Sequence, residues 1–166
     1  VSGALQGAGY DQIEDQMLNY QEEIENLRVQ NLANGQQIAK LQMQLDNDEA
    51  LQLAANVYQV FFESDATNLK SGSVDNLQKI ADQIINNSRI AWVNVVGHSD
   101  DTGDDTYNMK LAKERADTVA AYLQGRGLSK DQIKVTALGA NRAIATNSTP
   151  EGRQLNRRVE ITVQLN

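Results

Sequence analysis

The first third of the chain repeats apolar residues at alternating steps of three and four, and polar residues, mostly Gln, Glu and Asn, lie between them. One core position of this heptad pattern is occupied by Met17, Ile24, Asn31, Ile38 and Leu45, and the other by Ile13, Tyr20, Leu27, Asn34 and Leu41. So narrow a stripe does not stabilise an isolated helix, so it must pack on another copy or on itself. The pattern predicts a coiled-coil helix over about residues 10–55.

The middle of this helix admits two arrangements. A buried Asn at the first core position often fixes the register of a two-stranded coil, so Asn31 favours a parallel dimer. Asn34-Gly35 is also a turn signal, and a break there would produce an antiparallel hairpin with arms at about 13–31 and 37–55. The heptad register is unchanged across this dipeptide, which favours the dimer. A solvated helix lying on the rest of the protein is the third alternative.

The pattern changes at Val57, where a β-branched and aromatic run predicts a strand over 57–62. A helix start follows at Ser71, and a second strand is expected over 90–96, ending at Gly97. A second helix follows that strand. The inward faces of the two helices are expected to hold Val74, Leu77, Ile80, Ala81 and Ile84 in the first, and Leu111, Arg115, Ala116, Val119, Tyr122 and Leu123 in the second.

The remaining segments complete an alternating pattern. The second helix closes at Gly125 and Gly127, and a third strand is expected over 133–138. Thr149-Pro150 is a good helix opening, and alternation over 159–163 predicts a last strand. The order β-α-β-α-β-(α)-β predicts an α+β fold whose sheet is covered on one face by helices. We therefore expect a helical coiled-coil spacer at 1–55 and a folded domain at 56–166.

The negative charge of the chain lies in the helical segment. Residues 1–50 hold nine acids and two bases, a net charge of −7, and the whole chain also has a net charge of −7. The other residues therefore balance. This distribution argues against nucleic acid as a partner, because phosphate binding needs clustered Lys and Arg.

Several classes of protein and site are disfavoured by composition. No apolar run approaches the roughly 18 residues that a membrane span needs. The chain has no cysteine, which excludes disulfides and leaves a zinc site only one histidine and carboxylates. The chain begins with Val1 instead of Met, so we expect that a targeting or membrane segment originally preceded it.

The stretch GHSDDTGDDTYN at 97–108 holds four aspartates and the only histidine. Counting from Asp100, Gly103 stands fourth and Leu111 twelfth, whereas a calcium-binding EF-hand loop needs Gly sixth and Glu twelfth. His98 and Asp100 could suggest an acid–base pair, but no nucleophile accompanies them. We therefore expect neither a metal site nor a catalytic centre.

Recognition of a charged ligand is the third possibility for this stretch. Asp100 follows the end of a strand, where α/β folds place ligand sites. Asn108, Leu111 and Arg115 share one face of the following helix, and Arg115 can lean back toward Asp100. Such a pocket suits a zwitterion, with its ammonium on Asp100 and its carboxylate on Arg115. From spacing alone, a mutual salt bridge between Asp100 and Arg115 fits equally well.

Several ordered motifs occur together over about residues 57–165. They are Phe61-Phe62 with Asn68-Leu69, His98-Ser99-Asp100, Gly103, Asn108, Leu111, Arg115-Ala116, Val119, Leu123, the connection Gly125 to Ser129, Gly139, and the tail GRQLNRRVEI at 152–161. Together they resemble the peptidoglycan-binding signature of OmpA-like C-terminal domains, the family that includes the lipoprotein Pal and the flagellar stator protein MotB.

The resemblance implies roles for particular residues. In this family, the residues that match Asp100 and Arg115 hold the zwitterionic end of diaminopimelate in the peptide stem of peptidoglycan. The supporting pocket would comprise Thr102, Gly103 and Asn108, the rim residues Ser64 and Asp65, and Arg157, which would touch the ligand or serve packing.

Two positions depart from the family pattern. Ala112 stands where the family usually has Ser, and Ala143 where it often has Pro. The first change removes a potential hydrogen bond near the site, and the second loosens a loop. Neither touches the Asp100 and Arg115 pair.

The resemblance implies a periplasmic, non-catalytic protein that anchors a membrane-tethered protein or complex to peptidoglycan and needs no cofactor. Its partners would be peptidoglycan, a second copy through the N-terminal helix, and a membrane channel or envelope complex. The long heptad segment favours inner-membrane attachment and a MotB-like stator or secretion-accessory subunit. A Pal-like outer-membrane lipoprotein or barrel tail is the alternative, and a coiled-coil protein-binding scaffold without peptidoglycan affinity is another. A peptidoglycan hydrolase is a more distant alternative, because the sequence offers neither a nucleophile motif nor a set of metal ligands.

Overall fold

The computed structural model describes residues 2–166, with side chains from residue 9 onward. The chain divides into two compact units between Leu45 and Asp46. Residues 46–55 belong to the second unit, where Ala50 and Leu53 are buried. The functional boundary after residue 55 stays a prediction. Val1, on which the expectation of a preceding segment rests, lies outside the described residues.

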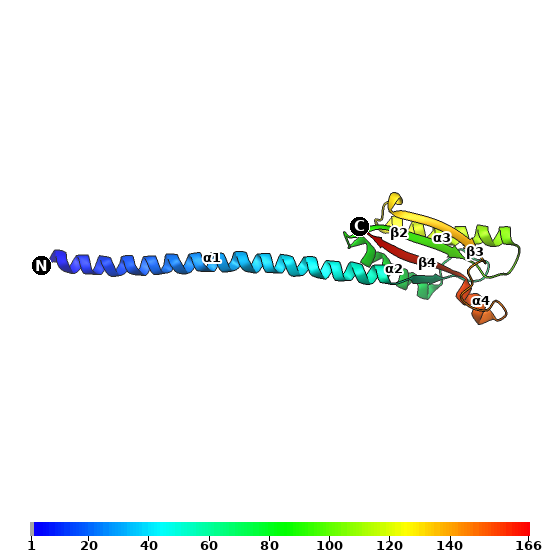
Figure 1. Ribbon diagram of the computed structural model, residues 1–166, viewed down its shortest axis with the longest axis horizontal. Helices are drawn as coiled ribbons and strands as arrows, with labels where there is room; N and C mark the ends of the chain where they lie inside the picture. The colour runs from blue at the N-terminus through cyan, green and yellow to red at the C-terminus, as the bar shows by residue number, and fades with distance from the viewer. Residues whose placement is uncertain (1) are drawn as a thin grey trace. The chain divides into compact units, whose positions relative to one another are not determined.

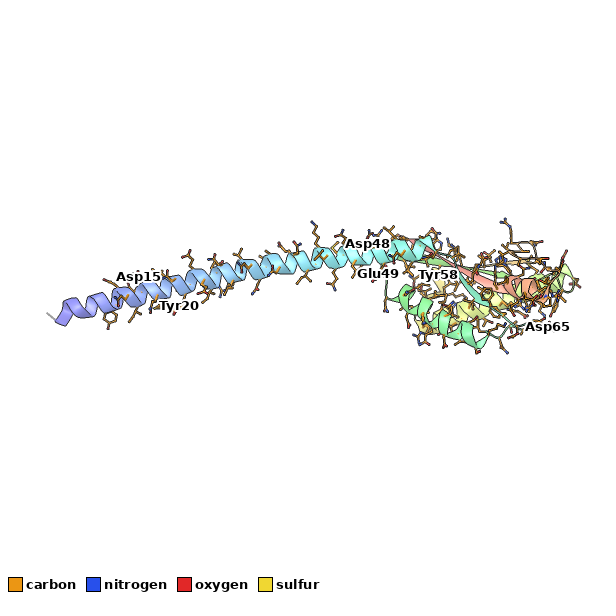
Figure 2. All side chains as sticks on the ribbon, turned by 90° about the horizontal axis from the view of Figure 1, so that it is seen from below. Asp15, Tyr20, Asp48, Glu49, Tyr58 and Asp65 are labelled. Carbon is orange, nitrogen blue, oxygen red and sulfur yellow. The ribbon has the colours of Figure 1, made fainter. Side chains whose placement is uncertain are left out.

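The N-terminal segment is one helix, α1 (Ser2–Ala55). It continues through Asn34 and Gly35, so the described chain does not form the hairpin that this dipeptide could have produced. Its large heptad-core side chains are between 50% and 62% exposed, and Figure 2 shows Tyr20 projecting outward from the helix. The long helix is confirmed, while the coiled coil stays a prediction. Within residues 2–166, none of the helices is both long and apolar enough to cross a bilayer.

Four strands form one mixed sheet in the order β1-β4-β2-β3. The strands are β1 (Tyr58–Phe61), β2 (Ile90–His98), β3 (Ile133–Gly139) and β4 (Arg158–Leu165). Strand β4 lies between β1 and β2 and is antiparallel to both, whereas β2 and β3 are parallel. The parallel pair needs a crossover, and helix α3 supplies it.

Three α-helices accompany the sheet: α2 (Ser71–Ile85), α3 (Asp105–Arg126) and α4 (Pro150–Asn156). The predicted helix opening at Thr149 is confirmed, because its side chain accepts a hydrogen bond from the Gly152 amide, and Gly127 caps α3 as predicted. The helix continues through Gly125, where an end was also expected. Two predicted inward positions differ: Val74 is 38% exposed and Tyr122 is only half-buried. A short 3-10 helix, η1 (Lys130–Gln132), was not predicted.

The core lies between one face of the sheet and helices α2 and α3, as predicted. Alternate residues of the central strands, such as Val93, Val95 and Ile161, pack against Leu77 of α2 and Val119 of α3 in one buried cluster. Figure 1 shows α3 running behind the sheet.

Close approach of α3 to β2 depends on Gly97. A Cβ atom at Gly97 would lie 1.9 Å from the Ala112 carbonyl oxygen. No other residue has room there, so this glycine fixes the distance between β2 and α3. The same contact places the end of β2, and with it Asp100, beside the first turns of α3.

Candidate functional site

A cavity of about 410 Å³ opens where β2 ends and α3 begins. It is lined by Ser64, Asp65, Asp100, Thr102, Gly103, Tyr107, Leu111 and Arg115. Six of these are residues that the sequence predicted for the site, and they come from the β1–α2 connection, the β2–α3 connection and α3. Figure 2 places Asp65 at the opposite end of the domain from Tyr58. The cavity is therefore remote from the last turns of α1.

Asp100 is 6% exposed, and its two carboxylate oxygens have different partners. Oδ1 accepts a hydrogen bond from the Thr102 amide at 3.0 Å, and Oδ2 accepts one from Arg157 Nη1 at 2.9 Å. Burial raises the pKa of Asp100, but the hydrogen bonds from Arg157 and Thr102 outweigh burial and hold the pKa below its usual value. Asp100 is therefore an oriented anion at neutral pH.

Arg115 is fully buried and is held by backbone carbonyl oxygens. Its Nε, Nη1 and Nη2 atoms donate to the carbonyls of Ala66 at 2.9 Å, His98 at 3.3 Å and Glu63 at 3.0 Å. The guanidinium carbon lies 5.6 Å from the centre of the Phe62 ring. Burial lowers the pKa of Arg115 to about 10, which still leaves it charged at neutral pH.

The two central residues do not form the mutual salt bridge that spacing allowed. The ionic partner of Asp100 is Arg157, and the hydrogen bonds of Arg115 go to the main chain. Both side chains nevertheless line the same cavity. One anion and one cation thus face a shared space.

Two predicted residues lie outside the cavity wall. Asn108 is 2% exposed in α3, and its Oδ1 has no hydrogen-bond partner among the described residues. Arg157 supports the site from behind through Asp100. Gly103 lies in the wall with a φ of +88°, which a side chain rarely adopts, and a Cβ there would lie 3.1 Å from Tyr107 Cδ1.

His98 and Asp100 do not form a hydrogen-bonded pair. It is 2% exposed, and its Nε2 atom lies 3.7 Å from Glu160 Oε2. Neither ring nitrogen has a hydrogen-bond partner in the described part of the chain. Burial, followed by the nearby Arg158 charge, lowers the pKa of His98 to about 4, so the ring is neutral at pH 7. Between residues 9 and 166, no group of three His, Asp or Glu could hold a metal ion.

Sequence reasoning missed some contributors to the site. Tyr107 lines the cavity, and its position four residues before Leu111 could have identified it, since both lie on one face of α3. Gln154 stands behind Arg157, and it accepts a hydrogen bond from Lys70, which lies 84 residues away in the sequence. No local pattern in the sequence indicates such a contact.

The fold and the site define an α+β domain with a cavity, lined by one anion and one cation, at the end of a central strand. Residues 61–157 match the OmpA family model, and the chain belongs to that family. The resemblance inferred from the sequence is therefore confirmed.

Individual relatives share the same region. The chain is 39% identical over 104 residues to the Probable lipoprotein YiaD of Escherichia coli, covering 63% of this chain and 47% of that protein. It is 39% identical to the Peptidoglycan-binding protein ArfA of Mycobacterium bovis, again over 63% of this chain and 32% of that protein. The chain thus spans about half or less of these relatives.

Two solved structures share the fold. The C-terminal domain of Helicobacter pylori MotB superposes with a TM-score of 0.60 at 27% identity, covering 67% of this chain and 87% of that chain. The cell wall anchor of the type VI secretion system from Pseudomonas aeruginosa superposes with a TM-score of 0.57 at 30% identity, covering 66% and 81%. None of these four names describes an enzyme.

Proposed function

We propose that residues 56–166 form a non-catalytic domain that binds peptidoglycan through the diaminopimelate of the stem peptide. The observation that carries this proposal is the shared cavity of Asp100 and Arg115, which presents one buried anion and one buried cation to the same space. The name of the relative ArfA, a peptidoglycan-binding protein, supports the choice of polymer.

The hydrogen-bonding capacity left in the cavity suits a zwitterion. Arg115 uses three of its five N–H groups on backbone carbonyls, so two are left for a ligand carboxylate. Each oxygen of Asp100 accepts one hydrogen bond from the protein and can accept another from a ligand ammonium. Because the protein holds both groups in place, little ordering is needed when the ligand binds.

The remaining residues of the site have supporting roles. Ser64, Asp65 and Thr102 add polar groups to the wall, and Gly103 permits the turn that brings Thr102 to Asp100. Asn108 packs under the wall, and Arg157 holds Asp100. Neither a metal nor a cofactor takes part.

The domain anchors a membrane-tethered protein or complex from the periplasm. A MotB-like stator or a secretion-accessory subunit at the inner membrane is the favoured context, supported by the likeness to MotB and to the secretion-system anchor. A Pal-like outer-membrane lipoprotein or barrel tail is the alternative, supported by the likeness to YiaD. The partner would be a membrane channel or another envelope complex.

Helix α1 acts as a spacer and pairs with a second copy. The large apolar residues of its heptad stripe are each at least half exposed, and apolar stripes of this kind are buried in coiled coils. Two domains on one coil would bind the polymer bivalently and gain avidity when their spacing suits the mesh.

Co-sedimentation of the chain with purified diaminopimelate-type peptidoglycan tests the proposal. Wild type is expected in the pellet, and Asp100→Ala and Arg115→Ala variants with intact folds in the supernatant. Asp101→Ala is the matched control, because Asp101 is the exposed neighbour of Asp100. Free diaminopimelate should release the protein, whereas cadaverine, which carries two ammonium groups and no carboxylate, should not.

The other outcomes have distinct meanings. If wild type and both Ala variants pellet equally, the Asp100 and Arg115 site is not the binding site. If the wild type stays in solution, the domain does not bind this polymer, and the coiled-coil protein-binding scaffold becomes the better hypothesis.

A further inference from the structure

A second layer of side chains holds Arg157 on the side away from the cavity. Gln154 Oε1 accepts a hydrogen bond from Arg157 Nη2 at 3.0 Å and another from Lys70 Nζ at 2.6 Å. Gln154 Nε2 donates to the Phe62 carbonyl at 3.1 Å, and Arg157 Nε donates to the same oxygen at 3.3 Å. Gln154 therefore joins α4, the start of α2 and the end of β1 to Arg157.

The backbone fixes each part of this layer. Gln154 belongs to α4, whose first turn is capped by Thr149, and Arg157 is the residue that ends α4. Lys70 is the residue before α2, and its ammonium group also lies 3.7 Å from Glu63. The guanidinium of Arg157 thus donates one hydrogen bond to Gln154 Oε1 and another to Asp100 Oδ2.

The chemistry at position 154 is specific to an amide. The carbonyl oxygen receives two cationic donors, Lys70 and Arg157, and the amide nitrogen donates to a main-chain oxygen. A carboxylate at this position would compete with Asp100 for Arg157, and an apolar side chain would leave one edge of the guanidinium unheld.

We propose that Gln154 is a positioning residue that orients Arg157 toward Asp100 and thereby prepares Asp100 to accept the ammonium group of the ligand. This inference rests on the proposed function only for the identity of the ligand. The effect on Asp100 itself belongs to the free protein. The other charged groups facing Asp100 across the cavity wall are Arg115 and Asp65.

The direct test is to measure the pKa of the Asp100 carboxyl by carbon-detected NMR titration of the whole chain. In wild type, the hydrogen bond from Arg157 helps to hold this pKa below its usual value. Gln154→Met keeps the length of the side chain and removes its hydrogen bonds, so the pKa of Asp100 should rise. The control is Leu155→Met on the same helix, because Leu155 is exposed and should leave this pKa unchanged.

The same variants are compared for binding of free diaminopimelate. Gln154→Met should weaken binding by about 3- to 10-fold, the effect of losing one orienting hydrogen bond. Gln154→Glu provides a second variant of matched length, in which the new carboxylate shares Arg157 and again raises the pKa of Asp100.

A double-mutant cycle separates positioning from general structural support. In an Arg157→Met background, Gln154→Met should no longer change the pKa of Asp100, because its effect passes through Arg157. An unchanged Asp100 pKa in both Gln154 variants, or an equal rise with and without Arg157, would overturn the inference. If wild type binds no diaminopimelate, the proposed function fails, while the titration still decides the role of Gln154.

Discussion

Asp100 and Arg157 form a buried ion pair, with 2.9 Å between Oδ2 and Nη1 and with both side chains no more than 10% exposed. Arg115, the cation expected from sequence spacing to face Asp100, is instead fixed by carbonyl oxygens. The positive charge of Arg115 therefore has no carboxylate partner among the described residues that line the cavity. The carboxylate of the proposed ligand would therefore not have to displace Asp100 from Arg115.

Replacement of Arg115 by lysine should reduce both stability and binding, although the positive charge is kept. A lysine ammonium cannot reach all three carbonyls that the planar guanidinium joins, so buried acceptors lose their partners. We expect Arg115→Lys to lower the free energy of unfolding by about 2–4 kcal/mol and to abolish peptidoglycan co-sedimentation. Urea denaturation and the pelleting assay measure the two effects.

Arg126→Lys is the comparison for this change, because Arg126 is an exposed arginine on the same helix that pairs with Asp82. It should leave the free energy of unfolding nearly unchanged, because an exposed ion pair contributes little to stability. A stable Arg115→Lys variant that still pellets would show that the guanidinium network is dispensable.

Replacement of glycine by alanine should change stability in opposite directions at Gly97 and at Gly125. Gly97→Ala would place a Cβ atom 1.9 Å from the Ala112 carbonyl oxygen, and β2 and α3 would have to separate. We expect a loss of about 3 kcal/mol or more in the free energy of unfolding, measured by urea denaturation. Gly125→Ala, on the surface of α3 with nothing within 4 Å, should instead stabilise the protein by about 0.5–1 kcal/mol. Equal effects of the two substitutions would contradict the predicted close contact.

Local patterns were sufficient to predict most of the fold. The first strand, the capped helix at Thr149 and the end of α3 at Gly127 follow from a β-branched and aromatic run, a cap and a glycine, which act over a few residues. Helix α1 shows the limit of such signals. Asn34-Gly35 is a turn signal in isolation, yet the helix continues through it.

The candidate site was predictable only in part. Asp100, Gly103 and Arg115 lie within one strand–loop–helix segment, so their spacing brought them together in advance. The pairing of Asp100 with Arg157 was not predicted, because it joins the residue between α4 and β4 to the β2–α3 connection across 57 residues. It depends on the central position of β4 in the sheet, which element order alone does not specify.

His98 should make the stability of the domain depend on pH. Its pKa in the folded state is about 4, below the ordinary 6.5, so the unfolded chain binds more protons between these values. The contribution of the neutral His98 ring to stability is therefore fully present above pH 6.5. As the pH falls toward 4, the free energy of unfolding decreases by about 2–3 kcal/mol through this group.

The measurement is the free energy of unfolding of wild type and His98→Phe between pH 4 and 7.5. The difference between the two proteins isolates His98, because carboxylates such as Asp100 titrate in both. Wild type should lose stability faster than the variant as the pH falls from 6.5 to 4. Parallel curves would mean that the ring is not held in its neutral form.

Pairing of α1 with a second copy can be tested at two positions that are similarly exposed in the single chain. Ile24 is 50% exposed in the heptad seam, and Val29 is 58% exposed on the outward face of the same helix. In a dimer, Ile24→Asp would bury two carboxylates against each other, whereas Val29→Asp would leave them in water. We expect Ile24→Asp to raise the dimer dissociation constant by about 100-fold or more and Val29→Asp to leave it nearly unchanged, as measured by sedimentation equilibrium.

The orientation of the pair follows from cysteine cross-linking, since the chain contains no cysteine of its own. In a parallel dimer, Ile24 faces its copy, so Ile24→Cys should form an intermolecular disulfide on mild oxidation, while Val29→Cys should not. An antiparallel dimer would leave Ile24→Cys uncross-linked although the protein still sediments as a dimer. A wild-type chain that sediments as a monomer would remove the basis for bivalent binding, and a single domain would then have to bind peptidoglycan without avidity.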